Sequence, residues 1–446
     1  MRLHRLLAVL VPVAVVASAC TSTPSAGTTT KLTIAAVQGG EDAGLKAIAP
    51  MYKQQKGVTL EIVEAPYDAL YSKLVTAFQA KDATYDLIMM DDPWMPKFGT
   101  DGSLSDLGPL GITADPDIAQ VVWDVGTWPP PRGPVPPSEK SKPKQLLGVT
   151  IVGNVEMFMY RKDLTPTAPA SYDDVLTNAK AQNKAGSVSG YIIRGKATNP
   201  VVADFLPILW SQGGDVFDEN WNVVLDNDAS KAAIKFLVED LKGVAQTDPG
   251  STDASDRDKI MANGQGYQSS VWPGEIGTAV LDPAVTKVAG KVAFIPIPKG
   301  PSGKGVGMMG NWMLGIPKAS KNQQAAADFI KWMLQADTQK TYAQNNGIPS
   351  RTSILKDAEL GKTNVYFPVL ADALQAANPY FSVLADAFAA PPNWRPRTDQ
   401  WNAVETIIGT DLNAALAGTM TAQAAVADAS KQIRTLMKGA GYPTTQ

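Results

Sequence analysis

Two residue types that often carry enzyme chemistry are almost missing from this sequence. Its 446 residues include one histidine, His4, and one cysteine, Cys20, and both lie at the N-terminal end. A chain that loses this end has no imidazole, so neither a Ser/His/Asp nucleophile nor an imidazole-based zinc site can be built. Catalysis by paired carboxylates, or no catalysis at all, remains.

The N-terminal segment has the pattern of a secretion signal. Arg2 and Arg5 precede an apolar run of about 11 residues, whereas a bilayer span needs about 20. Small residues then lead to Cys20, in a pattern that resembles the lipobox of bacterial lipoproteins; an ordinary signal peptide is the alternative. We expect residues 1–19 to be the signal peptide, Cys20 to be lipidated, and the Ser/Thr-rich residues 20–30 to form a flexible tether. The protein would then be anchored to the outer face of the cell membrane.

The charge balance argues against a nucleic-acid partner. The formal charge of −3 becomes −5 when the signal peptide is removed together with Arg2 and Arg5. A nucleic-acid-binding protein needs a basic surface to neutralise phosphates. With one cysteine, the chain also cannot form an internal disulfide.

The folded part opens with alternating strand and helix patterns. Apolar runs or alternation predict strands at 31–37, 58–63 and 85–90, and helical spacing predicts helices at 41–56 and 67–80. Such alternation builds a mostly parallel sheet that binds ligands beyond the carboxyl ends of its strands. Two segments, 38–42 and 91–94, occupy such ends.

Four segments in order along the chain resemble the extracellular solute-binding protein family 1, the carbohydrate-binding lipoproteins of ABC importers. They are PASYDDVLTN (169–178), FLPILWSQGGDVF (205–217), residues 294–317, and GIPSR (347–351). The resemblance implies an α/β, two-lobed periplasmic-binding-protein-like fold with a ligand cleft between the lobes, which two or three crossing strands join. It further implies an N-terminal lobe of residues 31–150 and 292–346 and a C-terminal lobe of residues 151–291 and 347–446.

The function that follows from the resemblance is capture of a solute outside the cytoplasm. The lobes would close around a sugar, oligosaccharide or polyol, and the closed form would deliver it to the permease subunits of an ABC importer. Such receptors need no cofactor or metal and usually act as monomers.

The candidate binding residues combine aromatic planes for the C–H face of a sugar with planar polar groups for its hydroxyls. The sequence offers ten tryptophans, and the four we favour stand beside Pro, Gly or Asn rather than inside a helical pattern. The polar candidates lie near the predicted strand ends or in the matching segments. The full set is Gln38, Glu41, Asp92, Trp94, Asn154, Trp272, Asn311, Trp312, Trp394 and Arg395. Glu41 has a second interpretation, as the residue that caps the first helix.

Asp91 and Asp92 are adjacent, so on a strand they point to opposite faces and only one can enter the cleft. We favour Asp92. The same argument weakens a glycoside hydrolase with paired carboxylates, which is one alternative function. Another is a receptor for an anionic solute such as a glycerophosphodiester, which Arg351 or Arg395 would hold; a surface ion pair is the other interpretation of each arginine.

Overall fold

The computed structural model describes residues 30–369 and 393–444. The predicted signal peptide, Cys20 and nearly all of the predicted tether lie outside the described residues. Among the described residues, no helix combines the length and the apolar character that a bilayer crossing needs.

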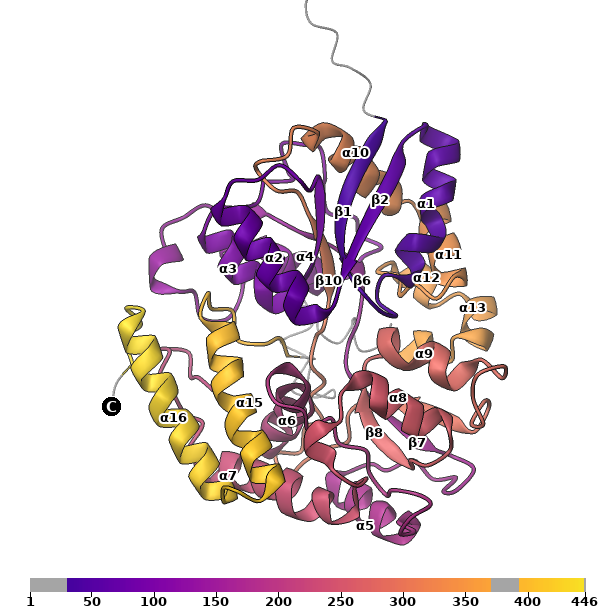
Figure 1. The fold of residues 1–446 in the computed structure, drawn as a ribbon, viewed down its shortest axis with the longest axis vertical. Coiled ribbons are helices and arrows are strands. Elements are labelled where there is room, and N and C mark those ends of the chain that lie inside the picture. The colour runs from indigo at the N-terminus through magenta and orange to yellow at the C-terminus, as the bar shows by residue number, and fades with distance from the viewer. Residues whose placement is uncertain (1–29, 370–392, 445–446) are drawn as a thin grey trace, which may run out of the picture.

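The first half of the molecule is built on a five-stranded sheet with the order β2-β1-β3-β10-β6 (Figure 1). β1 is parallel to both β2 and β3, whereas β10 runs antiparallel to β3 and β6. The predicted strand, helix, strand, helix, strand order is therefore confirmed. Because the second crossover reverses direction across β1, right-handed connections place α1 and α2 on opposite faces of the sheet. The bounds are β1 (Lys31–Val37), α1 (Ala43–Lys56), β2 (Thr59–Ala65), α2 (Tyr67–Gln79), β3 (Leu87–Asp91), β6 (Val149–Val152) and β10 (Trp312–Gly315).

Further helices and a small hairpin complete this half. Asp92–Trp94 forms a 3-10 turn that leads directly from β3 into α3. The bounds are α3 (Met95–Thr100), α4 (Gln120–Val125), β4 (Thr127–Trp128), β5 (Gln145–Leu146), α10 (Gln323–Met333), α11 (Ala336–Gln344), α12 (Thr352–Leu355) and α13 (Ala358–Thr363). The helices α10 to α13 lie along the α1 side in Figure 1, and α1 contacts α11.

The second half contains a three-stranded antiparallel sheet, β8-β7-β9, and a group of helices. Side chains alternate along β7: Met157 and Met159 belong to the hydrophobic core around the first sheet, while Phe158 and Tyr160 belong to a second core. Most of this second core lies among α6, α7, α15 and α16. The bounds are β7 (Met157–Arg161), α5 (Tyr172–Gln182), α6 (Asn199–Gln212), α7 (Asp228–Lys235), α8 (Ala254–Ala262), β8 (Gln268–Val271), α9 (Pro273–Leu281), β9 (Val292–Ile295), α15 (Trp401–Ala417) and α16 (Ala422–Gly439).

Sheet membership differs from two of the predicted lobe boundaries, and a third, at residue 346, assigns α12 and α13 to the C-terminal lobe although their buried residues belong to the core around the first sheet. The boundary at residue 150 falls inside β6, which pairs with β10 in the first sheet. The boundary at residue 292 assigns β9 to the N-terminal lobe, but β9 pairs with β7 in the second sheet. The sequence could not show this because an apolar strand of four residues fits the edge of either sheet.

Three chain segments run side by side where the two halves meet. Val155 pairs with Met309, and Met308 pairs with Asn393, each through an isolated bridge. Two backbone hydrogen bonds tie the three segments further: the Glu156 amide donates to Met308, and the Met309 amide donates to Asn393. All three segments therefore lie at the place where relative motion of the two halves would be absorbed.

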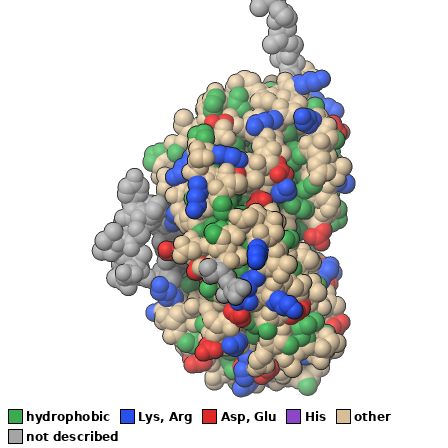
Figure 2. Space-filling view, turned by 90° about the vertical axis from the view of Figure 1, so that its left-hand side faces the viewer, with side chains coloured by type: hydrophobic (Ala, Val, Ile, Leu, Met, Phe, Trp, Pro, Cys, Tyr) green, Lys and Arg blue, Asp and Glu red, His purple; other side chains and the backbone are tan. Residues whose placement is uncertain are grey.

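The outer surface carries charges of both signs. Figure 2 shows basic and acidic side chains interspersed over one face of the molecule. This distribution differs from the single-sign basic face that phosphate backbones require.

Candidate functional site

A cavity of about 660 Å³ lies between the two halves. This volume is within the usual range for small-molecule sites. Residues at the carboxyl ends of β1 and β3, together with N-terminal residues of α2, α6, α8 and α9, line it. The cavity therefore lies where the carboxyl ends of parallel strands meet, as the sequence predicts.

Two walls enclose the cavity. The first wall consists of Gln38, Glu41, Tyr67, Asp91, Trp312 and Arg395, and the second wall of Arg194, Ser255, Asp258, Trp272 and Glu275. Of the residues predicted from the sequence, Gln38, Glu41, Trp272, Trp312 and Arg395 are brought together in this lining.

The remaining candidates lie behind the lining or away from it. Trp94 is 1% exposed and packs in an aromatic cluster, with ring centroids 4.8 Å from Tyr67 and 5.4 Å from Trp312. Asn311 is fully buried and its backbone N–H donates to Asp92 over 3.1 Å. Trp394 lies under the guanidinium of Arg132, 4.7 Å from it, and is not part of the lining.

The choice between the two adjacent aspartates is corrected by the structure. Asp91 lines the cavity, whereas Asp92 is fully buried. The reason is that β3 ends at Asp91, and Asp92 begins the 3-10 turn that carries it inward. The prediction assumed that the strand continues through Asp92. Because it ends at Asp91, the alternation of side chains does not extend to Asp92.

Asp91 and Arg395 of the first wall form a buried ion pair. The guanidinium of Arg395 donates to both carboxylate oxygens of Asp91, over 3.0 and 2.9 Å, and its Nη2 lies 3.2 Å from Asp92. Tyr67 donates its hydroxyl hydrogen to Asp91 over 2.8 Å. Burial nevertheless raises the pKa of Asp91 to about 6. Arg395 is thus already matched by carboxylates before a solute arrives.

Arg351 takes no part in the cavity. Its Nη1 donates to Asp117 over 3.0 Å, its Nη2 pairs with Asp115, and its Nε donates to the Leu334 carbonyl. The ion-pair interpretation of this arginine is therefore confirmed.

Glu41 and Asn154 join the two walls. The side-chain Nδ2 of Asn154 donates to Glu41 Oε1 over 3.2 Å, and its side-chain Oδ1 accepts from the Gly274 N–H, also over 3.2 Å. Asn154 belongs to the crossing segment after β6, and Gly274 lies in the first turn of α9. The capping interpretation of Glu41 is not supported, because Asp42 occupies the N-cap position of α1. Burial, followed by the nearby carboxylates of Glu275 and Asp91, raises the pKa of Glu41 well above its usual value.

Two glycines allow the walls to approach at this point. A Cβ at Gly40 would lie 2.7 Å from the Gly274 carbonyl oxygen, and a Cβ at Gly274 would lie 2.5 Å from Glu41 Oε2. Any side chain at either position would push the walls apart.

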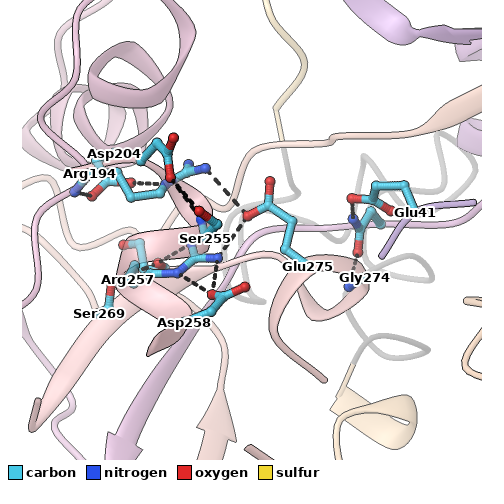
Figure 3. A network of polar contacts seen from close by, with 12 residues as sticks. Glu41, Arg194, Asp204, Ser255, Arg257, Asp258, Ser269, Gly274 and Glu275 are labelled. Carbon is cyan, nitrogen blue, oxygen red and sulfur yellow. Dashed lines mark hydrogen bonds and ion pairs between the residues drawn. The ribbon is translucent and has the colours of Figure 1, made fainter. Parts of the chain in front are cut away.

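The second wall contains a buried ionic network (Figure 3). Arg194 Nε donates to Asp204 over 2.9 Å, and its Nη1 reaches Glu275 at 3.4 Å. Arg257 Nη2 donates to Asp258 over 2.9 Å and to Glu275 over 2.8 Å. Arg194 also stacks on the indole of Trp272, 4.8 Å from the ring centroid. The network holds Trp272 and Glu275 in fixed positions at the edge of the cavity.

Sequence reasoning missed Tyr67, Arg194 and Glu275. Tyr67 is the first residue of the predicted helix 67–80, and its hydroxyl reaches Asp91. Arg194 and Glu275 stand in segments with no motif, and only the tertiary fold brings them to the cavity. Among the described residues, no His, Cys, Asp and Glu side chains are grouped so as to hold a metal ion.

Comparison with known protein families identifies the family of this chain. The model of the bacterial extracellular solute-binding protein family matches residues 36–340. The chain belongs to that family. It is therefore a solute-binding protein of ABC transport, and not a glycoside hydrolase.

Relatives and solved structures match over nearly the whole chain. A probable amino-acid ABC transporter periplasmic-binding protein of Sinorhizobium fredii is 25% identical over 96% of this chain and 94% of its own. Maltose-bound MalE3 of T. maritima is 25% identical, with a TM-score of 0.77 over 91% of this chain and 99% of that one. A solute-binding protein of Agrobacterium vitis with bound D-mannitol is 26% identical, with a TM-score of 0.76 over 93% and 100%. The α/β two-lobed fold is thereby confirmed.

Proposed function

We propose that this receptor captures a carbohydrate or polyol in the cavity between its two walls and delivers it to an ABC importer. The observation that carries the proposal is the composition of the lining. Trp272, Trp312 and Tyr67 offer aromatic surfaces, and Gln38, Asp91 and Glu275 offer planar polar groups for hydroxyls. The structures with maltose and D-mannitol support a hydroxylated solute.

Capture would proceed by closure of two lobes about the three crossing segments. Closure requires that the solute bind the closed form more tightly than the open one. Solute contacts to both walls supply that difference, since the two walls are built from different segments of the chain. The division that we propose follows the sheets: β9 moves with the second sheet and β10 with the first.

The charge of the lining argues against an anionic solute. Among the described residues, the lining has six carboxyl groups and three cationic side chains. Arg395 is held by Asp91, and Arg351 is outside the cavity. A glycerophosphodiester would therefore meet more repulsion than attraction.

A thermal-shift screen of the mature protein tests the proposal. The compounds are sugars, polyols, amino acids and phosphodiesters, and tryptophan emission is recorded in parallel. We expect a hydroxylated compound to raise the melting temperature and to change the emission without being altered itself. A response confined to amino acids or phosphodiesters would overturn the assignment of the solute class.

Two tryptophan variants locate the binding site. Trp312→Ala removes an aromatic surface of the cavity and is expected to abolish the thermal shift. Trp394→Ala changes a tryptophan outside the lining and is expected to preserve it. Equal losses in both variants would show that the solute binds elsewhere.

We also propose that the receptor is a monomer anchored through lipidated Cys20. Replacement of Cys20 by Ser in the full-length protein is expected to release the receptor from the membrane fraction into the medium or periplasm. If the variant stayed with the membranes, the anchor would have to lie elsewhere.

A further inference from the structure

The first wall contains two carboxyl groups. Asp91 forms an ion pair with Arg395, whereas Glu41 forms no ion pair with the described residues. Its Oε1 accepts from Asn154, while its Oε2 is shielded from solvent and has no hydrogen-bond partner among the described residues. Among the described residues, no lysine or arginine forms an ion pair with Glu41, whereas Asp91 and Glu275 each have arginine partners. A buried carboxyl oxygen without a partner is costly, so the bound solute is expected to supply one.

The cations of the lining are already engaged. Arg395 pairs with Asp91, and Lys196 lies 3.4 Å from Asp253. Arg194 is shared between Asp204 and Glu275. A conformational change within the cavity therefore cannot provide a cation for Glu41 without breaking another pair.

The second wall has buried hydrogen-bond donors that lack acceptors among the described residues. Arg194 Nη2 and Trp272 Nε1 are buried donors with no acceptor among the described residues, and both residues line the cavity. Because the charge of Arg194 is already balanced by two carboxylates, neutral oxygens such as hydroxyls suit these donors. Glu41 thus requires a hydrogen-bond donor on the solute, whereas the second wall requires acceptors on the same solute.

We propose that the solute is a hydroxylated amine, such as an amino sugar or amino polyol, whose ammonium group lies against Glu41. Its hydroxyl oxygens would accept from the donors of the second wall. The aromatic rings of Trp312 and Tyr67, in the same wall as Glu41, also suit a cation. This inference deepens the proposed function and depends on it.

Binding of such a solute would be linked to proton release. Glu41 keeps its proton to a higher pH than an ordinary glutamic acid, because burial and the surrounding carboxyls raise its pKa. An ammonium group stabilises the ionised carboxylate, so the proton leaves as the solute binds. Affinity is therefore expected to rise with pH until the amine itself loses its proton. The groups that face Glu41 are Asp42 of α1, Asp91 of β3, Asp258 of α8, Glu275 of α9, Tyr342 of α11 and Tyr366.

The experiment compares matched compounds on the mature protein by calorimetry. Each set consists of a 2-amino-2-deoxyhexose, its N-acetyl derivative and the parent hexose, or of a 1-amino-1-deoxyalditol and the parent alditol. Titrations in two buffers of different ionisation enthalpy report protons released. Glu41→Gln keeps the shape and removes the charge, and Glu219→Gln changes an exposed glutamate as the control for net charge.

We expect an amine to bind at least about tenfold more tightly than its hydroxyl parent and to release a proton, because a charged hydrogen bond is stronger than a neutral one. Glu41→Gln should remove both effects, and Glu219→Gln neither. If hydroxyl or N-acetyl compounds bind as well as the amines, the amine inference is wrong while the proposed function stands. If no compound of any set binds, both are wrong.

Discussion

Glu41 and Glu275 are the same residue type in the same cavity, yet their hydrogen-bond and ion-pair partners differ. Glu275 receives Arg257 at 2.8 Å and Arg194 at 3.4 Å, so its charge is balanced within the second wall. Within the described part of the chain, Glu41 receives one side-chain hydrogen bond, from the amide of Asn154. The carboxyl charges of the second wall are thus balanced by arginines, whereas Oε2 of Glu41 in the first wall has no hydrogen-bond partner among the described residues.

The largest effect is expected from breaking the balanced wall. Arg257→Met leaves Asp258 and Glu275 without their shortest ion-pair contacts in a buried site, and the loss of one partner of a buried pair costs about 3–5 kcal/mol. Chemical denaturation at pH 7 measures the free energy of unfolding. A loss below that of a surface pair would show that the network does not stabilise the fold.

The next largest effect is expected from the ionisation of Glu405, a buried carboxyl group whose pKa is affected by burial and then by Arg395 and Asp91 of the first wall. Burial raises the pKa of Glu405 to about 7 from an ordinary 4.5, and its side chain is 5% exposed. The folded state then favours the protonated form, so the contribution of Glu405 to stability is fully present below pH 4.5 and is lost as pH rises through about 7. The difference corresponds to up to about 3 kcal/mol.

Urea unfolding from pH 4.5 to 8 measures this dependence in the native chain and in Glu405→Gln. The glutamine variant cannot ionise, so its stability should lose that part of the pH dependence. Parallel curves for the two proteins would contradict the assignment.

A smaller effect is expected where the walls meet. Gly274→Ala places a methyl group 2.5 Å from Glu41 Oε2 and 2.9 Å from Asn154 Nδ2. Overpacking of this kind costs about 1–3 kcal/mol, which we expect to appear as weaker solute binding because closure is hindered. Gly243→Ala, where a Cβ meets nothing within 4 Å, is the matched control and should bind normally.

The smallest effect is expected outside the cavity. Arg434 pairs with Asp226 at 2.7 Å, but the two side chains are 30% and 40% exposed. Arg434→Met should therefore cost less than about 1 kcal/mol in the same denaturation experiment. It is the matched partner of Arg257→Met, and equal losses in the two variants would erase the distinction between the buried network and a surface pair.

The sequence was most informative where function depends on local pattern. Strand ends and their following turns predicted the positions of Gln38 and Glu41. The Pro, Gly or Asn context predicted four tryptophans, of which Trp272 and Trp312 line the cavity. The same reasoning failed for Trp94, because the Asp-Pro turn before it continues inward as a helix and buries the indole among aromatic rings.

The remaining site residues depend on contacts between distant segments. Asp91 and Arg395 are 304 residues apart in the chain, and Glu275 is 81 residues from Arg194. Residue type and spacing carry no record of such pairings, so Arg194 and Glu275 could not be singled out. The solute contacts of all these residues stay predictions.

The position of Arg395 in the chain has a consequence for biogenesis. This arginine is contributed by a segment near the C-terminal end, yet it neutralises Asp91, which ends the third strand of the first sheet. A nascent chain therefore cannot finish the solute chamber until almost all of it has been synthesised. A chain truncated before this segment would leave Asp91 without its arginine partner.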